Sequence, residues 1–334
     1  MLTDRRSWVI RGLLGAALLL AGPLTGIAQA ATSGGCGTTK YVGPDQLKVR
    51  TRASSGAPEV SGGCLAHDAK VVEQEQVTVS GGCNTTEQWS RISTPVAGWV
   101  PTNKLTTLPP NKVKVLLIGD SMMAQSGPFA KKELESAGCA VEVVGVPGTG
   151  LMPDWWLGRI DELVTQHDPD YVVTLFVGNY FPPYIKNPDG TEILPRTPEF
   201  DAYWTKQDVE LTRRAIRRGG RMFYVSPPPQ GADWQGSDHI YDLHKKVAQT
   251  YPTTGYLSVG RWVADRYGKY VHTWPRTDGR IAQIRDADRG HFAPEGAEVY
   301  GARTAWELGR AVCPRFPIPR RPDGGIPLIR PYPW

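Results

Sequence analysis

The residues with the clearest potential for chemistry are one serine and a distant aspartate–histidine pair. Ser121 ends the tripeptide Gly119-Asp120-Ser121, and Asp288 precedes His291 by three residues. A histidine can take the proton of a serine hydroxyl, and an aspartate in the same turn can orient the imidazole. Together these groups could transfer an acyl group from an ester to the serine. Asp286 is a second candidate for the orienting acid, although its spacing of five residues to the histidine suits a tight turn less well.

Two further segments could bind the negatively charged oxygen that forms during acyl transfer. The segment Gly145-Val146-Pro147-Gly148-Thr149-Gly150 contains glycines, which let a backbone amide approach a bound oxygen closely. Asn179, in Val177-Gly178-Asn179-Tyr180, offers a side-chain amide. A preorganised donor of this kind stabilises the transition state by on the order of 3 kcal/mol.

Three of these segments follow apolar runs, and the runs alternate with amphipathic stretches. The runs predict strands and the stretches predict helices. The expected strands are Val113–Ile118, Val141–Val146, Tyr171–Val177, Met222–Val225 and Tyr256–Val259, and the expected helices are Phe129–Ala137, Trp155–Gln166, Ala202–Arg218, Ile240–Thr250 and Pro294–Ala311. Such alternation is typical of an α/β domain with a parallel sheet covered on both faces. Ser121 lies at the carboxyl end of a strand, where these sheets bind ligands, but it could also be an ordinary N-cap.

From Val113 to about Gly309 the chain resembles the SGNH, or GDSL-type, hydrolase family. Its four blocks match Gly119-Asp120-Ser121, Gly148, Asn179 and Asp288-Arg289-Gly290-His291, in that order. The resemblance implies a flavodoxin-like three-layer α/β/α sandwich with a parallel sheet. It also implies that Ser121 is the nucleophile, His291 the general base and Asp288 its orienting acid. The implied oxyanion hole consists of the amides of Ser121 and Gly148 and the side chain of Asn179.

Candidates for substrate contacts lie beside these blocks, at Thr149, Trp155 and Tyr180. Aromatic side chains next to polar groups suit sugar rings, and packing in the core or in loops is the competing interpretation. The chain departs from the family pattern at Val177, where a glycine is usual, and at Tyr180, where an aspartate is frequent.

The predicted function is an exported serine esterase that removes ester-linked groups, O-acetyl groups in particular, from a cell-envelope polysaccharide or glycan. The alternatives are an O-acetyltransferase that uses the same three residues, a lipase-type enzyme and a non-catalytic cell-wall-binding protein. No metal or other cofactor is expected, because the remaining histidines lack ligand spacing. Nucleic acid is not an expected partner, because the formal net charge is only +5 and charges of both signs are interspersed.

Residues 40–108 have a different pattern, of short strands separated by Gly, Ser, Pro and Asn, which predicts a small all-β barrel. The segments Leu47-Lys48-Val49-Arg50, Trp89-Ser90-Arg91-Ile92 and Gly98-Trp99-Val100 resemble those of bacterial SH3-like (SH3b) domains. The resemblance implies binding of peptidoglycan, or packing against the catalytic domain. Trp89 and Trp99 are each expected to pack in the core of this barrel.

The two ends of the chain differ from both predicted domains. Residues 1–30 combine Arg5-Arg6, the apolar run Leu13–Leu20 and Ala28-Gln29-Ala30, a combination typical of an export signal. Either general secretory or twin-arginine export would make the protein periplasmic or secreted. A retained anchor is the minor alternative, because a membrane span needs about 20 apolar residues. A hydrolase domain over 111–313 would then be followed by a Pro/Arg-rich tail, 314–334.

The five cysteines predict disulfide bonds, because all of them lie in the part of the chain that would be exported. One bond is expected between Cys139 and Cys313. The connectivity among Cys36, Cys64 and Cys83 stays open.

Overall fold

The computed structural model describes residues 37–43, 46–66, 69–80, 86–110, 112–151, 155–177, 186–187, 189–231 and 237–312. The predicted export signal and the C-terminal tail therefore lie outside the described residues. So do Cys36, Cys83 and Cys313. The predicted disulfide bonds stay predictions. Of the two described cysteines, Cys64 is exposed and Cys139 is buried.

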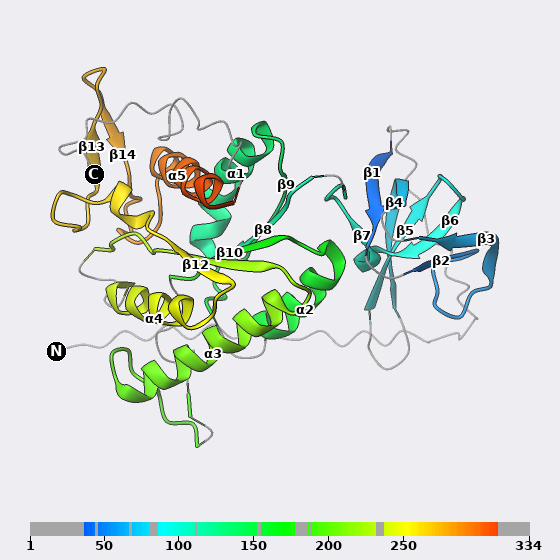
Figure 1. Cartoon of the computed structure of the whole chain (residues 1–334), viewed down its shortest axis with the longest axis horizontal. Helices are drawn as coiled ribbons and strands as arrows, with labels where there is room; N and C mark the ends of the chain where they lie inside the picture. Colours follow the sequence, from blue (N-terminus) through cyan, green and yellow to red (C-terminus); the bar gives the residue numbers. More distant parts are fainter. Residues whose placement is uncertain are drawn as a thin grey trace, which may run out of the picture. The chain divides into compact units, whose positions relative to one another are not determined.

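Residues 114–257 contain a five-stranded parallel sheet (Figure 1). Its strands are β8 (Lys114–Gly119), β9 (Ala140–Gly145), β10 (Tyr171–Leu175), β11 (Arg221–Val225) and β12 (Thr254–Leu257). Their spatial order is β12-β11-β10-β8-β9, which is the flavodoxin-like order 2-1-3-4-5 when the strands are counted along the chain. The predicted parallel α/β sheet is therefore confirmed, and each strand lies within a few residues of its expected position.

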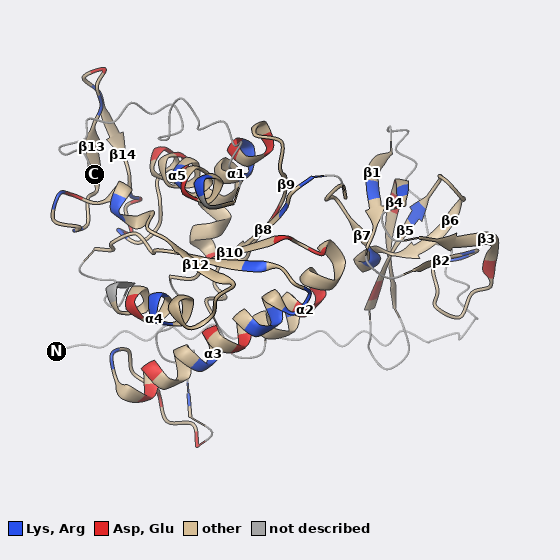
Figure 2. Cartoon of the chain, viewed as in Figure 1, with Lys and Arg blue, Asp and Glu red and all other residues tan. Residues whose placement is uncertain are grey.

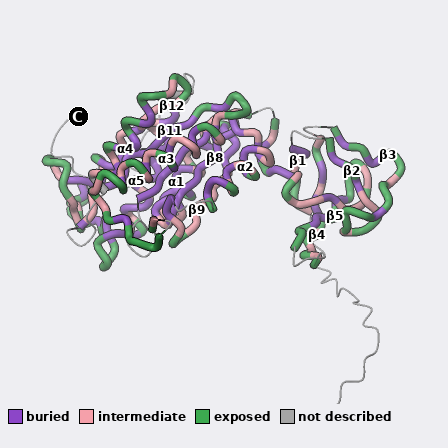
Figure 3. The backbone as a smooth tube through the Cα atoms, turned by 90° about the horizontal axis from the view of Figure 1, so that it is seen from below, coloured by how far each residue is buried: buried purple, intermediate pink, exposed green. Residues whose placement is uncertain are grey.

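Five helices cover the two faces of this sheet. They are α1 (Ser121–Ser136), α2 (Trp155–His167), α3 (Pro198–Ile216), α4 (Ser237–Thr250) and α5 (Pro294–Val312). Helices α1 and α5 pack into one apolar core with Val115 and Leu117 of β8. Helices α2, α3 and α4 pack into a second core with Leu116 and Ile118. Because successive side chains of a strand point to opposite faces, one strand serves both cores, and Figure 3 shows β8 buried along its length.

Helix α1 begins eight residues earlier than predicted. The expected start at Phe129 follows Gly127 and Pro128, two residues that usually break helices, but here both lie inside α1. A larger residue would not fit at position 127, because its Cβ would lie only 2.6 Å from the Cγ1 of Val143. The close approach of α1 to β9 therefore explains a glycine that made the sequence look non-helical.

The segment between β12 and α5 contains elements that the sequence analysis did not predict. A 3₁₀ helix, η3 (Gly260–Val263), is followed by a two-stranded hairpin of β13 (Thr273–Pro275) and β14 (Ile281–Gln283). The hairpin precedes the turn that carries Asp288 and His291. It was missed because each of its strands has only three residues.

Residues 38–106 form a separate antiparallel sheet of seven strands. The strands are β1 (Thr38–Val42), β2 (Leu47–Arg50), β3 (Glu59–Leu65), β4 (Lys70–Ser80), β5 (Thr86–Ile92), β6 (Gly98–Pro101) and β7 (Leu105–Thr106), and a 3₁₀ helix, η2 (Thr102–Lys104), precedes β7. The all-β character agrees with the prediction, whereas the likeness to SH3b domains stays a prediction. Trp89 is only 2% exposed and its indole donates to Glu87, which fits the expected core role.

The last strand of this sheet is hydrogen-bonded to helix α2. Thr106 Oγ1 lies 2.8 Å from His167 Nδ1, and Gln166 Nε2 donates to the carbonyl of Leu105 at 2.6 Å. Burial lowers the pKa of His167 to about 4, so the imidazole is neutral at pH 7. Leu108, the last residue of the predicted barrel, is buried.

Charged residues of both signs alternate along α2 and α3 (Figure 2). Several of them form ion pairs between the two helices, with Arg214 and Arg217 each 2.8 Å from Asp161. Among the described residues, no helix is both long enough and apolar enough to cross a membrane.

Candidate active site

Ser121 is the first residue of α1, directly after the buried strand β8. The N-cap of the helix is Asp120, whose Oδ1 accepts from the amide of Met122 at 3.0 Å. Capping is therefore the role of Asp120, and the hydroxyl of Ser121 is used otherwise. Ser121 Oγ lies 2.8 Å from His291 Nε2, across 170 residues of sequence.

Asp288 and His291 lie in one turn between β14 and α5. His291 Nδ1 forms a short hydrogen bond with Asp288 Oδ2, and Asp288 Oδ1 accepts from the amides of Gly290 and His291, both at 2.9 Å. Burial raises the pKa of Asp288, but these hydrogen bonds outweigh burial and hold the pKa below its ordinary value. The carboxylate is thus ionised at neutral pH. The carboxylate of Asp286, the other candidate, accepts a hydrogen bond from the amide of Ala287 instead.

The carboxylate of Asp120 also braces the neighbouring strand end. Its Oδ2 accepts from the amide of Val177 at 2.7 Å, and the whole residue is inaccessible to solvent. Val177 itself is buried in the core shared with α1. The valine that replaces the usual family glycine is therefore accommodated in the core.

Gly148 lies in the loop after β9, next to the strand that leads to Ser121. Gly145 pairs with Gly119 across the sheet, and the amide of Val146 donates to the Gly119 carbonyl at 2.9 Å. Gly148 has a φ of +80°, in the left-handed region that favours glycine. This register brings the loop to the same edge of the sheet as Ser121.

The three predicted substrate contacts differ in what the structure shows of them. The hydroxyl of Thr149 donates to the Val146 carbonyl and accepts from the indole of Trp156, so it stabilises the Gly148 loop. Trp155 is 45% exposed at the start of α2 and is open to a ligand. Tyr180 lies outside the described residues, as does Asn179, the predicted oxyanion donor.

Two residues that the sequence analysis missed hold the turn of His291 in place. Gln125, in α1, forms two hydrogen bonds with the backbone of Phe292. Arg285, which is fully buried, donates from Nη1 to the carbonyl of Gly290 at 2.8 Å. Their contacts are long-range in sequence or belong to no known motif, so no local pattern marks them.

A second aspartate–histidine pair lies far from solvent, between α3 and α4. His244 Nε2 is 3.5 Å from Asp208 Oδ1 and accepts from the indole of Trp204. Burial raises the pKa of Asp208 well above its ordinary value and lowers that of His244 to about 3. Since both side chains are at most 1% exposed, a substrate cannot reach this pair.

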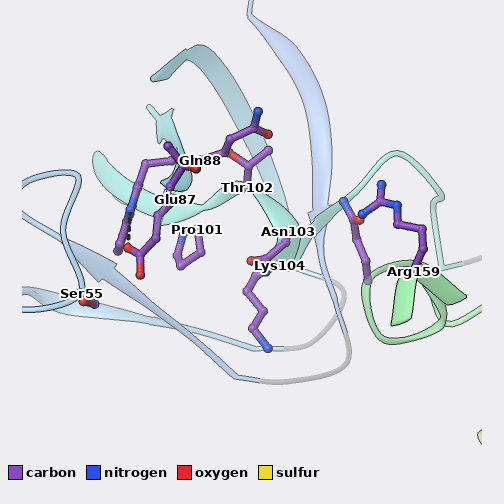
Figure 4. Close-up of a pocket in the computed structure, with 11 residues that line it drawn as sticks. Ser55, Glu87, Gln88, Pro101, Thr102, Asn103, Lys104 and Arg159 are labelled. Carbon is purple, nitrogen blue, oxygen red and sulfur yellow. Dashed lines mark hydrogen bonds between the residues drawn. The ribbon is translucent and has the colours of Figure 1, made fainter. Parts of the chain in front are cut away.

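A cleft of about 520 Å³ lies where the antiparallel sheet contacts α2 (Figure 4). Its lining includes Glu87, Gln88, Asn103 and Lys104 on one side and Arg159 on the other. The cleft contains none of the residues proposed for chemistry.

A family model described as "Protein of unknown function (DUF459)" matches residues 114–305, which is more than half of the chain. The chain belongs to the DUF459 family. The match to DUF459 spans both Ser121 and His291. A search of curated proteins found no match to this sequence.

Solved structures with a similar arrangement include three esterases. A carbohydrate esterase of family 3 from Talaromyces cellulolyticus is 14% identical, with 60% of this chain and 97% of that chain covered and a TM-score of 0.41. The esterase EstA from a Pseudoalteromonas species is 13% identical, with coverages of 60% and 98% and a TM-score of 0.41. A family two carbohydrate esterase from Cellvibrio japonicus is 11% identical, with coverages of 82% and 89% and a TM-score of 0.40.

Proposed function

We propose that the chain is a serine esterase of the SGNH type, with Ser121 as nucleophile, His291 as general base and Asp288 as the orienting acid. The observation that carries the proposal is the continuous hydrogen-bond chain from Ser121 Oγ through the imidazole of His291 to the Asp288 carboxylate. A serine hydroxyl is a weak nucleophile until a base accepts its proton, and this chain supplies the base and its orientation.

The reaction would follow from this geometry in two stages. Ser121 Oγ attacks the ester carbonyl while His291 Nε2 accepts the hydroxyl proton. The amides of Ser121 and Gly148 and the side chain of Asn179 would stabilise the resulting oxyanion. The C–O bond to the alcohol then breaks, and His291 returns the proton to the leaving oxygen. Water activated by His291 releases the acid and regenerates Ser121.

The proposed substrate is an O-acetylated polysaccharide or glycan of the cell envelope, reached by an exported enzyme. The proposal is supported by the solvent exposure of the site around the proposed base: the side chains of His291 and Asp288 are 31% and 43% exposed. An acyl chain of lipid type would favour a deep apolar pocket, whereas a sugar polymer needs an open surface. The exposed Trp155 follows the strand next to that of Ser121 and could stack on a sugar ring.

Active-site labelling tests this proposal directly. A fluorophosphonate probe is expected to add one phosphonyl group to the wild-type protein at Ser121, as located by peptide mass spectrometry. Ser121→Ala should abolish labelling. Ser126→Ala is the matched control, because this serine lies in the same helix and its hydroxyl donates to the Met122 carbonyl. Labelling that survives in Ser121→Ala would overturn the assignment of the nucleophile.

Product analysis separates the hydrolase from a transferase. An esterase incubated with acetylated xylan or peptidoglycan releases free acetate, whereas a transferase moves the acetyl group to an added sugar acceptor. We expect acetate in the presence and absence of an acceptor. Acetylated acceptor without acetate release would identify the transferase.

We also propose that residues 40–108 bind peptidoglycan, with the cleft of Figure 4 as the binding site. Its volume lies within the usual range of ligand pockets, and the side chains of Gln88, Asn103 and Lys104 in its wall could form hydrogen bonds with a glycan or peptide. Co-sedimentation of the full chain with purified peptidoglycan, and its weakening in the variant Asn103→Ala, would test this role. Equal sedimentation of the two proteins would exclude the cleft as the binding site.

A further inference from the structure

The side chain of Gln125 contacts the turn of His291 as a neighbouring strand would. Its Oε1 accepts from the amide of Phe292, and its Nε2 donates to the carbonyl of Phe292, each at 3.1 Å. Residues that face each other in an antiparallel sheet exchange the same two hydrogen bonds. A single glutamine therefore fixes both the position and the direction of the backbone just after His291.

The same glutamine has a fixed position relative to Ser121. Both residues lie in α1, and Gln125 follows Ser121 by four residues, so their side chains emerge on the same face one turn apart. Phe292 is bonded directly to His291. These contacts form a closed ring. It runs from Ser121 along one helix turn to Gln125, through the hydrogen bonds to Phe292, along the chain to His291 and back to Ser121 through a hydrogen bond.

The other hydrogen bonds of the turn act mainly within it or on its far side. The amide of Asp286 donates to the carbonyl of His291 at 3.0 Å, which fixes the shape of the turn. Arg285 holds the Gly290 carbonyl, and the buried ring of Phe292 sets how deeply the turn is inserted. Neither of these two hydrogen bonds is made with α1, whereas the Gln125 contact links the residue next to His291 directly to the helix of Ser121.

We propose that Gln125 is a positioning residue that sets the distance and angle between His291 Nε2 and Ser121 Oγ. The inference rests on the proposed serine esterase function. Displacement of a reacting group by about 1 Å can lower a rate on the order of 100-fold. The contact acts on proton transfer in both stages, because His291 accepts the proton of Ser121 in the first stage and the proton of the attacking water in the second.

The test compares Gln125→Met, which keeps the length of the side chain without its hydrogen bonds, with Gln125→Glu, which can accept from the Phe292 amide but cannot donate when ionised. We expect kcat on an alkyl acetate to fall about 10- to 100-fold in Gln125→Met, with KM within about twofold of wild type. Gln125→Glu should lose less at low pH than at high pH relative to wild type, because its protonated carboxyl can donate again. The melting temperatures report whether each variant remains folded.

The leaving group gives a readout that a structural defect alone would not change. An alkoxide needs a proton from His291, whereas p-nitrophenolate leaves without one, so the loss should be greater for the alkyl ester. Gln74→Met is the matched control, since Gln74 also donates a side-chain hydrogen bond, to Ser93 Oγ at 3.0 Å, but lies in β4 of the antiparallel sheet and outside the cleft of Figure 4. We expect this control to keep the wild-type rate on both esters.

Two results would overturn the inference. One is a Gln125→Met enzyme with kcat within twofold of wild type, and the other is an equal loss on both esters. Either result leaves the proposed function intact as long as Ser121→Ala is inactive. Retained activity in Ser121→Ala would instead refute the proposed function itself.

Discussion

The turns that carry Ser121 and His291 meet in one hydrogen bond, yet one is part of the buried core and the other lies at the surface. Every residue of β8 is buried, and Asp120 is fully inaccessible to solvent. The side chains of His291 and Asp288 keep about a third or more of their exposure. The proposed nucleophile thus directly follows a buried strand of the sheet, whereas the proposed base lies in a surface turn that contacts it.

The supporting contacts differ in the same way. The carboxylate of Asp120 holds two backbone amides that belong to different elements, those of Met122 and Val177. The hydrogen bonds described above for the carboxylate of Asp288 are with Gly290 and His291, in its own turn. Substitution of Asp120, beside Ser121, should therefore reduce stability as well as activity. Substitution of Asp288, beside His291, should reduce activity alone.

Removal of either partner of the central hydrogen bond should have the largest effect. We expect Ser121→Ala and His291→Ala each to lower kcat on p-nitrophenyl acetate by at least about 10³-fold, because residues that act as a unit lose most of their effect when one is removed. The double variant should be little worse than either single variant. If the losses instead multiplied, the two residues would act independently and the proposed unit would be wrong. Steady-state kinetics of the three variants decide this.

Substitution of the orienting acid should have the next largest effect. Asp288→Asn should lower kcat by on the order of 10³-fold, because an amide cannot stabilise the imidazolium that forms. Its free energy of unfolding should change by less than about 1 kcal/mol, since the side chain is 43% exposed. Asp286→Asn is the control, with an expected loss of only a few-fold. A reversal of the two activities would make Asp286 the orienting acid.

Substitution of Asp120, unlike that of Asp288, should reduce the stability of the protein as well as its activity. Asp120→Ala leaves the buried amides of Met122 and Val177 without their acceptor. We expect the free energy of unfolding to fall by about 2–3 kcal/mol, as is typical when a buried charged hydrogen-bond partner is removed. Urea denaturation measures the change. A loss below 0.5 kcal/mol would contradict the distinction between a core turn and a surface turn.

As the pH is lowered, protonation of buried His167 should reduce the stability of the protein before protonation of Asp288 does. The pKa of buried His167 is lowered to about 4 from an ordinary 6.5, so the unfolded chain binds the proton more tightly. Stability should fall as the pH drops from 6.5 towards 4, with His167 contributing about 2 kcal/mol of loss at pH 5. Asp288 has a lowered pKa, so its contribution is lost only below the ordinary range of aspartate.

The variant His167→Asn isolates this effect. Denaturation at pH 7 and pH 5 should show a smaller pH-dependent loss in the variant than in wild type. His244, which is also buried and has a pKa of about 3, remains in both proteins and cancels in the comparison. Equal losses in the two proteins would show that His167 does not contribute to acid sensitivity.

Much of the architecture could be predicted from the sequence because its signals are local. Apolar runs of strand length predicted all five parallel strands, and amphipathic periodicity predicted the five helices. The signal failed at α1, where Gly127 and Pro128 concealed the first two turns, because close packing against Val143 is a tertiary property. It also failed at the β13–β14 hairpin, whose strands are too short for a periodic pattern to appear.

The residue types that are available for chemistry, and the strand ends that present them, could be predicted from the amino-acid sequence. Ser121, Gly148 and the Asp288–His291 pair are recognisable from their immediate neighbours. Three features became visible only in the folded chain. Asp120 is the helix cap, Asp288 and not Asp286 is hydrogen-bonded to the imidazole, and Gln125 and Arg285 support the turn. The physical reason is the range of the interactions. Hydrophobic periodicity is written over a few consecutive residues, whereas the Gln125–Phe292 contact joins positions 167 residues apart and leaves no pattern in either segment.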